Sequence, residues 1–272
     1  MGPRTSTLSR PVPPPARAEP SPAAELLAAP PPGAREKAFR DWIMGDGFPC
    51  VGAKSALVRD ALEVFEAGRI DCPASDLDIR AALKDFSESL HTSGPVVQSF
   101  AVVFEGPSTL SEGEFEWELW NRLQSLHNLD VAAGESWAEG VDRDPESAHF
   151  AFSVAGEPFF VVGLNPAASR PARRFDYPVM VFNSHEQFER LKGDGRYDQM
   201  QKIIRQRELA LCGSINPMLR DHGMGMAAAQ YSGRHVSLAW DCPFETKGNV
   251  AGKIADKAAA KSKAEAKVGE EA

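Results

Sequence analysis

Residues 149–191, HFAFSVAGEPFFVVGLNPAASRPARRFDYPVMVFNSHEQFERL, decide the expected fold of this chain. Two short apolar runs, His149–Val154 and Pro158–Leu164, are joined by Ala-Gly-Glu. Runs of this kind, joined by a short glycine-containing turn, predict a β-hairpin. A third run, Pro178–Phe182, is almost entirely apolar and therefore predicts a strand that is buried on both faces. We expect all three strands to belong to one sheet.

A cationic loop connects the second and third runs. It spans Asn165–Tyr177, and its three arginines are Arg170, Arg173 and Arg174. Guanidinium groups bind carboxylates or phosphates through paired hydrogen bonds. The alternative is a solvated, charged surface loop. If the arginines converge at the end of the strands, the site suits an anionic or metal-bearing ligand beside an apolar floor.

A helix is expected to begin directly after the third run. Ser184 is a suitable N-cap, and Gln187 follows three residues later, as in a capping box. His185 enters this helix at the strand-to-helix junction, and we expect it to lie next to the arginine loop. A lone histidine is more often a hydrogen-bonded structural residue than a ligand. This position distinguishes His185 from the other histidines of the chain.

The composition of the chain limits its class. With 272 residues, a formal net charge of −8, 43% hydrophobic and 25% charged residues, it resembles an ordinary globular protein. A general nucleic-acid binder needs a basic face, so that class is disfavoured. No apolar run approaches the roughly 20 residues of a membrane helix, and the first residues lack the apolar core of a secretory signal. Four cysteines make no disulfide framework in a chain of this length. We therefore expect a cytoplasmic protein with no nucleic-acid or membrane partner.

The chain divides into an arm, one domain and a tail. Residues 1–35 are rich in proline and alanine and are expected to be a disordered arm, and residues 247–272 form a charged, Lys/Ala-rich tail. In the domain, residues 36–246, apolar periodicity and caps predict a strand and four helices: Val96–Glu105 as the strand, and Lys54–Gly68, Asp76–His91, Ser111–His127 and Tyr197–Leu211 as the helices. Strands and helices do not alternate strictly. We therefore expect the α+β class, with a mostly antiparallel sheet covered by helices.

Two familiar site patterns are disfavoured. Gly47–Ser55, GFPCVGAKS, nearly matches a phosphate-binding loop, but Ala53 separates the second glycine from the lysine and no strand precedes it. Cys50 and Cys242 each lie beside proline and phenylalanine, where a thiolate can ligate heme iron. A buried apolar thiol is the favoured interpretation of both cysteines.

Several ordered motifs resemble the YqcI/YcgG family and cover roughly residues 40–245. They are FPCVGAKSAL (48–57), FFVVGLNPAASRPARRF (159–175), FNSHEQFERL (182–191), GSINPMLRDHG (213–223), QYSGR (230–234) and WDCPF (240–244). The characterised members are heme-dependent oxygenases that N-hydroxylate guanidino compounds, chiefly L-arginine, in antibiotic and other natural-product routes such as that to D-cycloserine. The resemblance therefore implies heme b, O2 as oxidant, an external electron donor and a guanidino substrate.

The resemblance also implies roles for individual residues. The arginine loop and Ser169 suit heme propionates. A histidine is expected as the axial ligand, with His185 the first choice. The next choices are His149 and His127. Tyr231 offers a hydroxyl for hydrogen bonding in the catalytic site.

One departure from the family concerns Asn165. Many relatives have histidine at this position of the Gly-Leu-x-Pro motif. If that histidine is the iron ligand, this chain has lost it. If it is a distal or outer-shell group, Asn165 substitutes as a hydrogen-bond donor, and this is the catalytic role that we assign to it.

Two other functions remain open at this point. One is a heme-binding or heme-sensing protein without turnover, in keeping with the dipeptides Cys72-Pro73 and Cys242-Pro243. The other is a non-heme enzyme that holds an anionic ligand at the arginine loop. Stoichiometric heme binding separates the first of these from the second, and arginine-dependent oxygen consumption separates the oxygenase from both.

Overall fold

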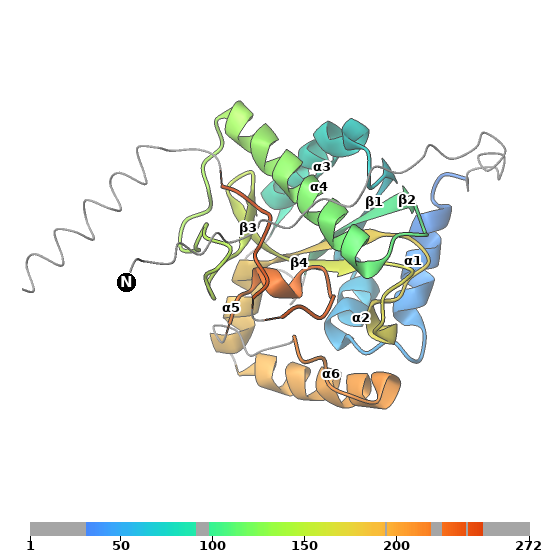
Figure 1. Ribbon diagram of the computed structural model, residues 1–272. Coiled ribbons are helices and arrows are strands. Elements are labelled where there is room, and N and C mark those ends of the chain that lie inside the picture. Colours follow the sequence, from blue (N-terminus) through green and yellow to red (C-terminus); the bar gives the residue numbers. More distant parts are fainter. Residues whose placement is uncertain (1–30, 91–97, 194, 219–224, 238, 247–272) are drawn as a thin grey trace, which may run out of the picture.

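The computed structural model describes residues 31–90, 98–193, 195–218, 225–237 and 239–246 (Figure 1). Most of the predicted N-terminal arm and all of the predicted tail lie outside these residues. No helix in the described part of the chain is long and apolar enough to cross a membrane.

Within the described residues, five strands form one sheet in the order β1-β2-β5-β4-β3. The strands are β1 (Leu62–Arg69), β2 (Ser99–Gly106), β3 (Phe152–Val154), β4 (Glu157–Leu164) and β5 (Val179–Ser184). Only β1 and β2 pair in parallel, and the other three pairings are antiparallel. The predicted α+β class with a mostly antiparallel sheet is therefore confirmed.

The predicted hairpin is β3–β4. Val154 pairs with Glu157, so the connection has two residues, Ala155 and Gly156. Both have positive φ angles, 52° and 77°. Two successive positive φ angles give the turn that matches the right-handed twist of the strands, and glycine reaches this conformation without strain. The third predicted strand is β5, whose Val179, Met180 and Phe182 are almost fully buried.

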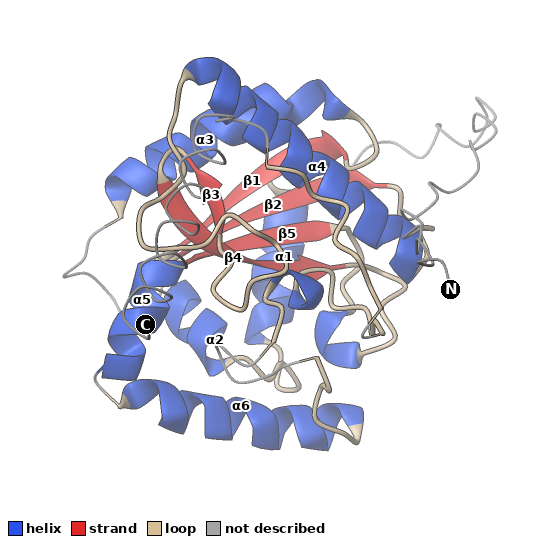
Figure 2. Cartoon of the chain, turned by 60° about the vertical axis from the view of Figure 1, so that its left-hand side comes forward, coloured by secondary structure: helices blue, strands red, loops and turns tan. Residues whose placement is uncertain are grey.

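Helices cover both faces of the sheet (Figures 1 and 2). They are α1 (Ala34–Met44), α2 (Val51–Val58), α3 (Asp76–Ser89), α4 (Glu112–Ala133), α5 (His185–Gly193) and α6 (Arg196–Cys212). Alternate residues of β2 show the two layers, because successive side chains of a strand point to opposite faces. Phe100 and Val102 belong to the core that α3 and α4 cover, whereas Ala101 and Val103 belong to the core that α1 and α2 cover.

The predicted helix Lys54–Gly68 is wrong in its second half. Helix α2 ends at Val58, Asp60 adopts a positive φ of 54°, and Leu62 begins β1. Leu62 and Phe65 share one face of the expected helix, but in the strand they serve the two different cores. An apolar run this short is compatible with both the helical and the strand periodicity. Parallel pairing with β2 makes it a strand.

The other predicted helices correspond to α3, α4 and α6. Ser111 and Glu114 form the predicted capping box of α4. The capping box expected at Ser184 is not formed, because Ser184 is still the last residue of β5. Its hydroxyl donates to Glu157, and the amide of Gln187 pairs with Gln98.

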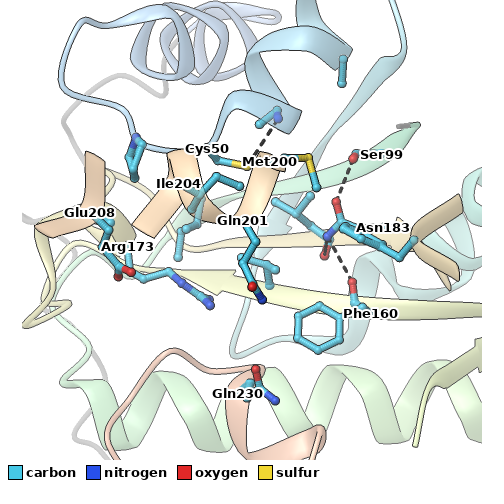
Figure 3. A pocket seen from close by; sticks show the side chains of 18 of the residues that line it. Cys50, Ser99, Phe160, Arg173, Asn183, Met200, Gln201, Ile204, Glu208 and Gln230 are labelled. Atoms are coloured by element: carbon cyan, nitrogen blue, oxygen red, sulfur yellow. Dashed lines mark hydrogen bonds between the residues drawn. The ribbon is translucent and has the colours of Figure 1, made fainter. Parts of the chain in front are cut away.

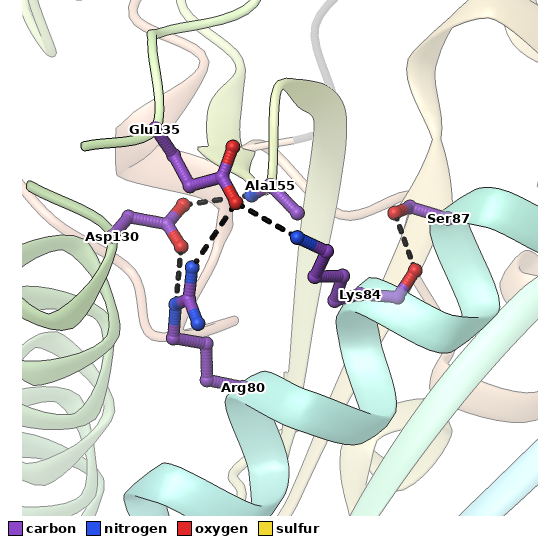
Figure 4. Close-up of polar contacts among 6 residues, drawn as sticks. All are labelled: Arg80, Lys84, Ser87, Asp130, Glu135 and Ala155. Carbon is purple, nitrogen blue, oxygen red and sulfur yellow. Dashed lines mark hydrogen bonds and ion pairs between the residues drawn. The ribbon is translucent and has the colours of Figure 1, made fainter. Parts of the chain in front are cut away.

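A polar network ties α3 to the end of α4 and to the hairpin (Figure 4). Arg80 Nε donates to Asp130 Oδ1 over 2.6 Å, and Lys84 Nζ donates to Glu135 Oε1 over 3.0 Å. The second oxygen of Asp130 accepts from the backbone N–H of Ala155 over 2.7 Å. Every oxygen of this buried aspartate therefore has a partner, and the network braces the α3–α4 face of the sheet.

Candidate ligand cavity

A cavity of about 290 Å³ lies on the opposite, α1–α2 face of the sheet. Its floor consists of Phe160 and Val162 from β4 and Val181 from β5, which are alternate residues of these strands. Trp42 and Phe48 add aromatic walls. An apolar pocket with a few polar groups is the usual form of a small-molecule site.

Helix α6 forms the outer wall of the cavity. Its lining residues are Tyr197, Met200, Gln201, Ile204, Arg205 and Glu208. Their spacing of three to four residues places them on one helix face. Glu208 is the one buried residue of α6, and the helix lies outside the layer that covers the sheet (Figure 2). The glycines at both ends, Gly195 and Gly213, adopt the left-handed conformation.

The three arginines of the loop point in different directions. Arg170 donates to Glu208 Oε1 over 2.9 Å and to the carbonyl of Ser214 over 2.6 Å. Arg174 turns back on its own loop and donates to the carbonyl of Ala168. Of the three, Arg173 lines the cavity. The three loop arginines therefore do not converge on one ligand, because Arg170 and Arg174 are used for local structure.

Ser169, the fourth predicted cofactor-binding residue, also faces away from the cavity. Its backbone N–H and its hydroxyl both donate to Glu112 Oε1, over 2.9 and 3.0 Å. Glu112 is the first residue of α4, which covers the other face of the sheet. This pair closes the loop against the start of α4.

Arg173 is held closely against the backbone. Its Nη1 donates to the carbonyl of Gly163 over 2.9 Å. Gly233, with a φ of 80°, lies alongside, and a β-carbon there would be 3.2 Å from the same nitrogen. Burial lowers the pKa of Arg173 to about 10, and the nearby Glu208 and Cys50 oppose this shift. The guanidinium therefore remains charged at neutral pH.

His185 also lines the cavity, but at the far end of β4 from Arg173. Arg173 bonds to Gly163, whereas His185 follows Ser184, which pairs with Phe159. Four residues along a strand correspond to about 13 Å. The expectation that His185 lies next to the arginine loop is therefore wrong. The loop joins one end of the antiparallel pair β4–β5, and His185 follows the other end.

The other two candidate histidines lie elsewhere. His149 is exposed, although its neighbour Ala148 lines the cavity. His127 is buried on α4 between the rings of Trp137 and Phe244, beside a separate polar cavity of about 220 Å³. In the described part of the chain, no group of three or more His, Cys, Asp and Glu side chains is arranged to hold a metal ion.

Asn165 and Tyr231 are buried outside the cavity lining. Asn165 Oδ1 accepts from the N–H of Ala167 over 2.8 Å and so shapes the start of the loop. The Tyr231 hydroxyl donates to the carbonyl of Phe159 and accepts from the N–H of Phe152. Burial raises the pKa of Tyr231. Its ring touches Phe160 on the floor, at 5.2 Å between centroids, so it supports the cavity from beneath.

Polar residues that the sequence did not single out also face the cavity (Figure 3). Ser99 donates to Asn183 Oδ1 over 2.8 Å, and Asn183 Nδ2 donates to the carbonyl of Phe160 over 3.1 Å. The amides of Gln201 and Gln230 point into the same space. The QYSGR motif contains Gln230 and could have pointed to it. Ser99 on β2 and Gln201 on α6 come from distant segments, and no motif in the sequence links them to the site.

Cys50 lines the cavity as the N-cap of α2, where its sulfur accepts from the N–H of Ala53. Burial raises the pKa of the Cys50 thiol. The side chain is therefore a neutral thiol at neutral pH, but it is half-buried and faces the cavity, whereas the favoured interpretation was a buried residue.

Glu157, at the start of β4, gives a prediction on pH. Burial, and then the nearby Glu186, raise the pKa of Glu157 to about 7, against a hydrogen bond from Ser184. Between pH 4.5 and 7 the folded protein keeps a proton that the unfolded chain has released, so the free energy of unfolding falls as the pH rises. Glu157→Gln is expected to remove this fall and to be more stable than the wild type by about 1 kcal/mol at pH 8, a value reduced for partial exposure.

Urea unfolding of both proteins at pH 4, 6 and 8 measures the difference. The two proteins should differ least at pH 4, where the Glu157 carboxyl of the wild type is mostly protonated in both the folded and the unfolded state. Parallel stability curves over the whole range would contradict the raised pKa of Glu157.

The geometry defines a single-sheet α+β protein with an apolar cavity between the sheet and α6, an arginine at one end and a histidine at the other. The chain belongs to the YqcI/YcgG family, whose model matches residues 39–245. No solved structure is significantly similar to the chain.

Three relatives illustrate the similarity. YcgG and YqcI of Bacillus subtilis (strain 168), both named as uncharacterized proteins, are 26% identical over 185 residues and 27% identical over 166 residues. These alignments cover 65% and 59% of this chain, and 72% and 64% of the relatives. DcsA of Streptomyces lavendulae, provisionally named an N(omega)-hydroxy-L-arginine synthase, is 31% identical over 163 residues, which cover 54% of this chain and 57% of DcsA.

Proposed function

We propose that the protein is a heme-dependent monooxygenase that N-hydroxylates the guanidino group of L-arginine or a close derivative. The similarity to DcsA carries the proposal, because its name refers to the N-hydroxylated product of arginine. The alignment covers little more than half of DcsA. We therefore propose the complete reaction for this chain and do not take it from the similarity alone. In that reaction one atom of O2 enters a guanidino N–H bond. The other leaves as water when an external donor supplies two electrons and two protons are taken up.

The cavity contains the types of residue that a heme site needs. A b-type heme needs an axial ligand, an apolar surround and partners for its propionates. His185, the floor of Phe160, Val162 and Val181, and Arg173 provide groups of these three types. When bound, heme would bind and activate O2.

The cavity is small for a heme, and α6 is the wall that we expect to move. Ligand pockets usually measure about 300–1,000 Å³, so 290 Å³ is at the lower end for a group as large as a porphyrin. We therefore expect α6 to move outward when heme binds. Its single buried side chain and its two left-handed terminal glycines favour this movement.

The protein's own residues would bind, orient and exclude water. A ring nitrogen of His185 would hold the iron. Glu189 Oε1 lies 3.9 Å from His185 Nε2, close enough to orient the imidazole after a small adjustment. The apolar floor would keep water away from the reacting groups, which strengthens every polar contact inside the cavity.

Titration of the full-length protein with hemin, followed by oxygen-uptake measurements, tests the proposal. We expect a one-to-one Soret complex with a histidine-type spectrum after reduction and addition of carbon monoxide. With a chemical reductant, oxygen uptake should then depend on L-arginine. Heme binding without this dependence would favour a heme-binding protein without turnover, and the absence of specific heme binding would remove both functions.

A further inference from the structure

We infer that Arg173, together with Gln230, holds a carboxylate of the ligand inside the cavity. The inference rests on the proposed function for the source of this carboxylate, which is either the α-carboxylate of an amino-acid substrate or a heme propionate. It deepens that function by assigning the ligand's anionic end to one residue of the arginine loop.

The first observation is a half-buried cation that forms no ion pair with a described residue. Arg173 donates one side-chain hydrogen bond, to the carbonyl of Gly163, although a guanidinium has five N–H donors. Glu208, the carboxylate in the cavity lining, is already engaged by Arg170 over 2.9 Å. Among the described residues, no carboxylate forms an ion pair with Arg173. A charge that is largely withdrawn from water is costly unless it is paired, so this position favours an anionic ligand.

The second observation is that the guanidinium is fixed in position. The bond from Nη1 to Gly163 anchors one side. Gly233 lets the side chain lie against the backbone, because a β-carbon at this position would be 3.2 Å from Nη1 and 3.3 Å from Cγ. The side chain is thus pre-organised, and its remaining donors are available to a ligand in the cavity.

The third observation is the neighbouring amide. Figure 3 shows the Arg173 guanidinium and the Gln201 and Gln230 amides directed into the same space. The side chain of Gln230 forms no hydrogen bond with another described residue. Two N–H groups of a guanidinium match a planar carboxylate, and an amide N–H adds a third donor.

The test compares Arg173→Gln with Arg174→Gln, a matched substitution in the same loop at an arginine directed away from the cavity. Calorimetry of the full-length heme-free protein measures binding of L-arginine and of agmatine, which lacks the carboxylate. Soret titration measures binding of hemin and of hemin dimethyl ester, which lacks free propionates. We expect Arg173→Gln to weaken the carboxylate-bearing ligand of one pair by about 10- to 100-fold relative to Arg174→Gln. The ligand without the carboxylate should bind both variants equally.

The pair that shows the loss identifies the source of the carboxylate. A loss confined to L-arginine assigns the substrate, and a loss confined to hemin assigns a propionate. Equal affinities in the two variants for both carboxylate ligands, with unchanged unfolding temperatures, would overturn the inference, as would a wild type that binds none of the four probes. If Arg173→Gln does not fold, Gln230→Leu serves instead, with an expected loss of a few-fold on the same ligand.

The outcomes also separate this inference from the proposed function. Discrimination of L-arginine from agmatine that depends on Arg173, in a protein without specific heme binding, would support the inference and contradict the heme-dependent function. Heme binding with arginine-dependent oxygen uptake, unaffected by Arg173→Gln, would contradict the inference alone.

Discussion

Substitution of His185 by alanine is expected to abolish one-to-one binding of hemin. Of the three candidate histidines, His185 is the one that lines the cavity. Loss of an outer-shell partner of a metal ligand typically costs about 10- to 100-fold in affinity, and we expect the loss of the ligand itself to exceed this range. The Soret band at equimolar hemin, and its position after reduction and addition of carbon monoxide, measure the effect.

Two comparisons make the result specific to the ligand. His149→Ala removes an exposed histidine beside the cavity and should leave the titration unchanged. His185→Gly creates space for free imidazole, which should restore the histidine-type spectrum. Full heme occupancy with a normal spectrum in His185→Ala would refute the assignment. A carbon monoxide spectrum of the thiolate type would move the ligand to Cys50 or Cys242.

The second large effect concerns stability. Arg122→Met is expected to lower the free energy of unfolding by about 3–5 kcal/mol at pH 7. Arg122 on α4 contacts both carboxylate oxygens of Asp76 at the start of α3, over 3.0 and 3.1 Å, and both side chains are less than a tenth exposed. The substitution leaves a buried carboxylate without a cation. Burial already raises the pKa of Asp76 despite Arg122.

The pH dependence and two further variants test this explanation. Protonation neutralises the orphaned Asp76, so the loss should be smaller at pH 4 than at pH 7. The double variant Asp76→Leu/Arg122→Met should recover most of the stability, because an apolar pair of similar size needs no charge partner. Lys37→Met, at the exposed pair Lys37–Asp41, should cost about 1 kcal/mol or less. Denaturant unfolding measures all four proteins, and a loss independent of pH would contradict the charge argument.

The central strands and most of the helices follow from local patterns. The β3–β4 hairpin was predictable because Ala155 and Gly156 allow the two positive φ angles of its turn. Helix α4 was predictable because Ser111 and Glu114 satisfy its first N–H groups. Strand β1 was not, since residues 62–69 fit both periods and only pairing with β2 distinguishes them.

The residue types of the candidate site were visible in the sequence, but their arrangement was not. The sequence alone determined that an arginine-rich loop and a histidine flank the apolar strand β5. Tertiary structure decided that Arg170 pairs with Glu208, that Arg174 turns away, and that Arg173 enters the cavity. It also placed His185 at the opposite end of the cavity floor from Arg173, and it placed α6 over the cavity. The physical reason is that turns and caps depend on neighbouring residues, whereas side-chain direction depends on partners from distant segments, which no local pattern specifies.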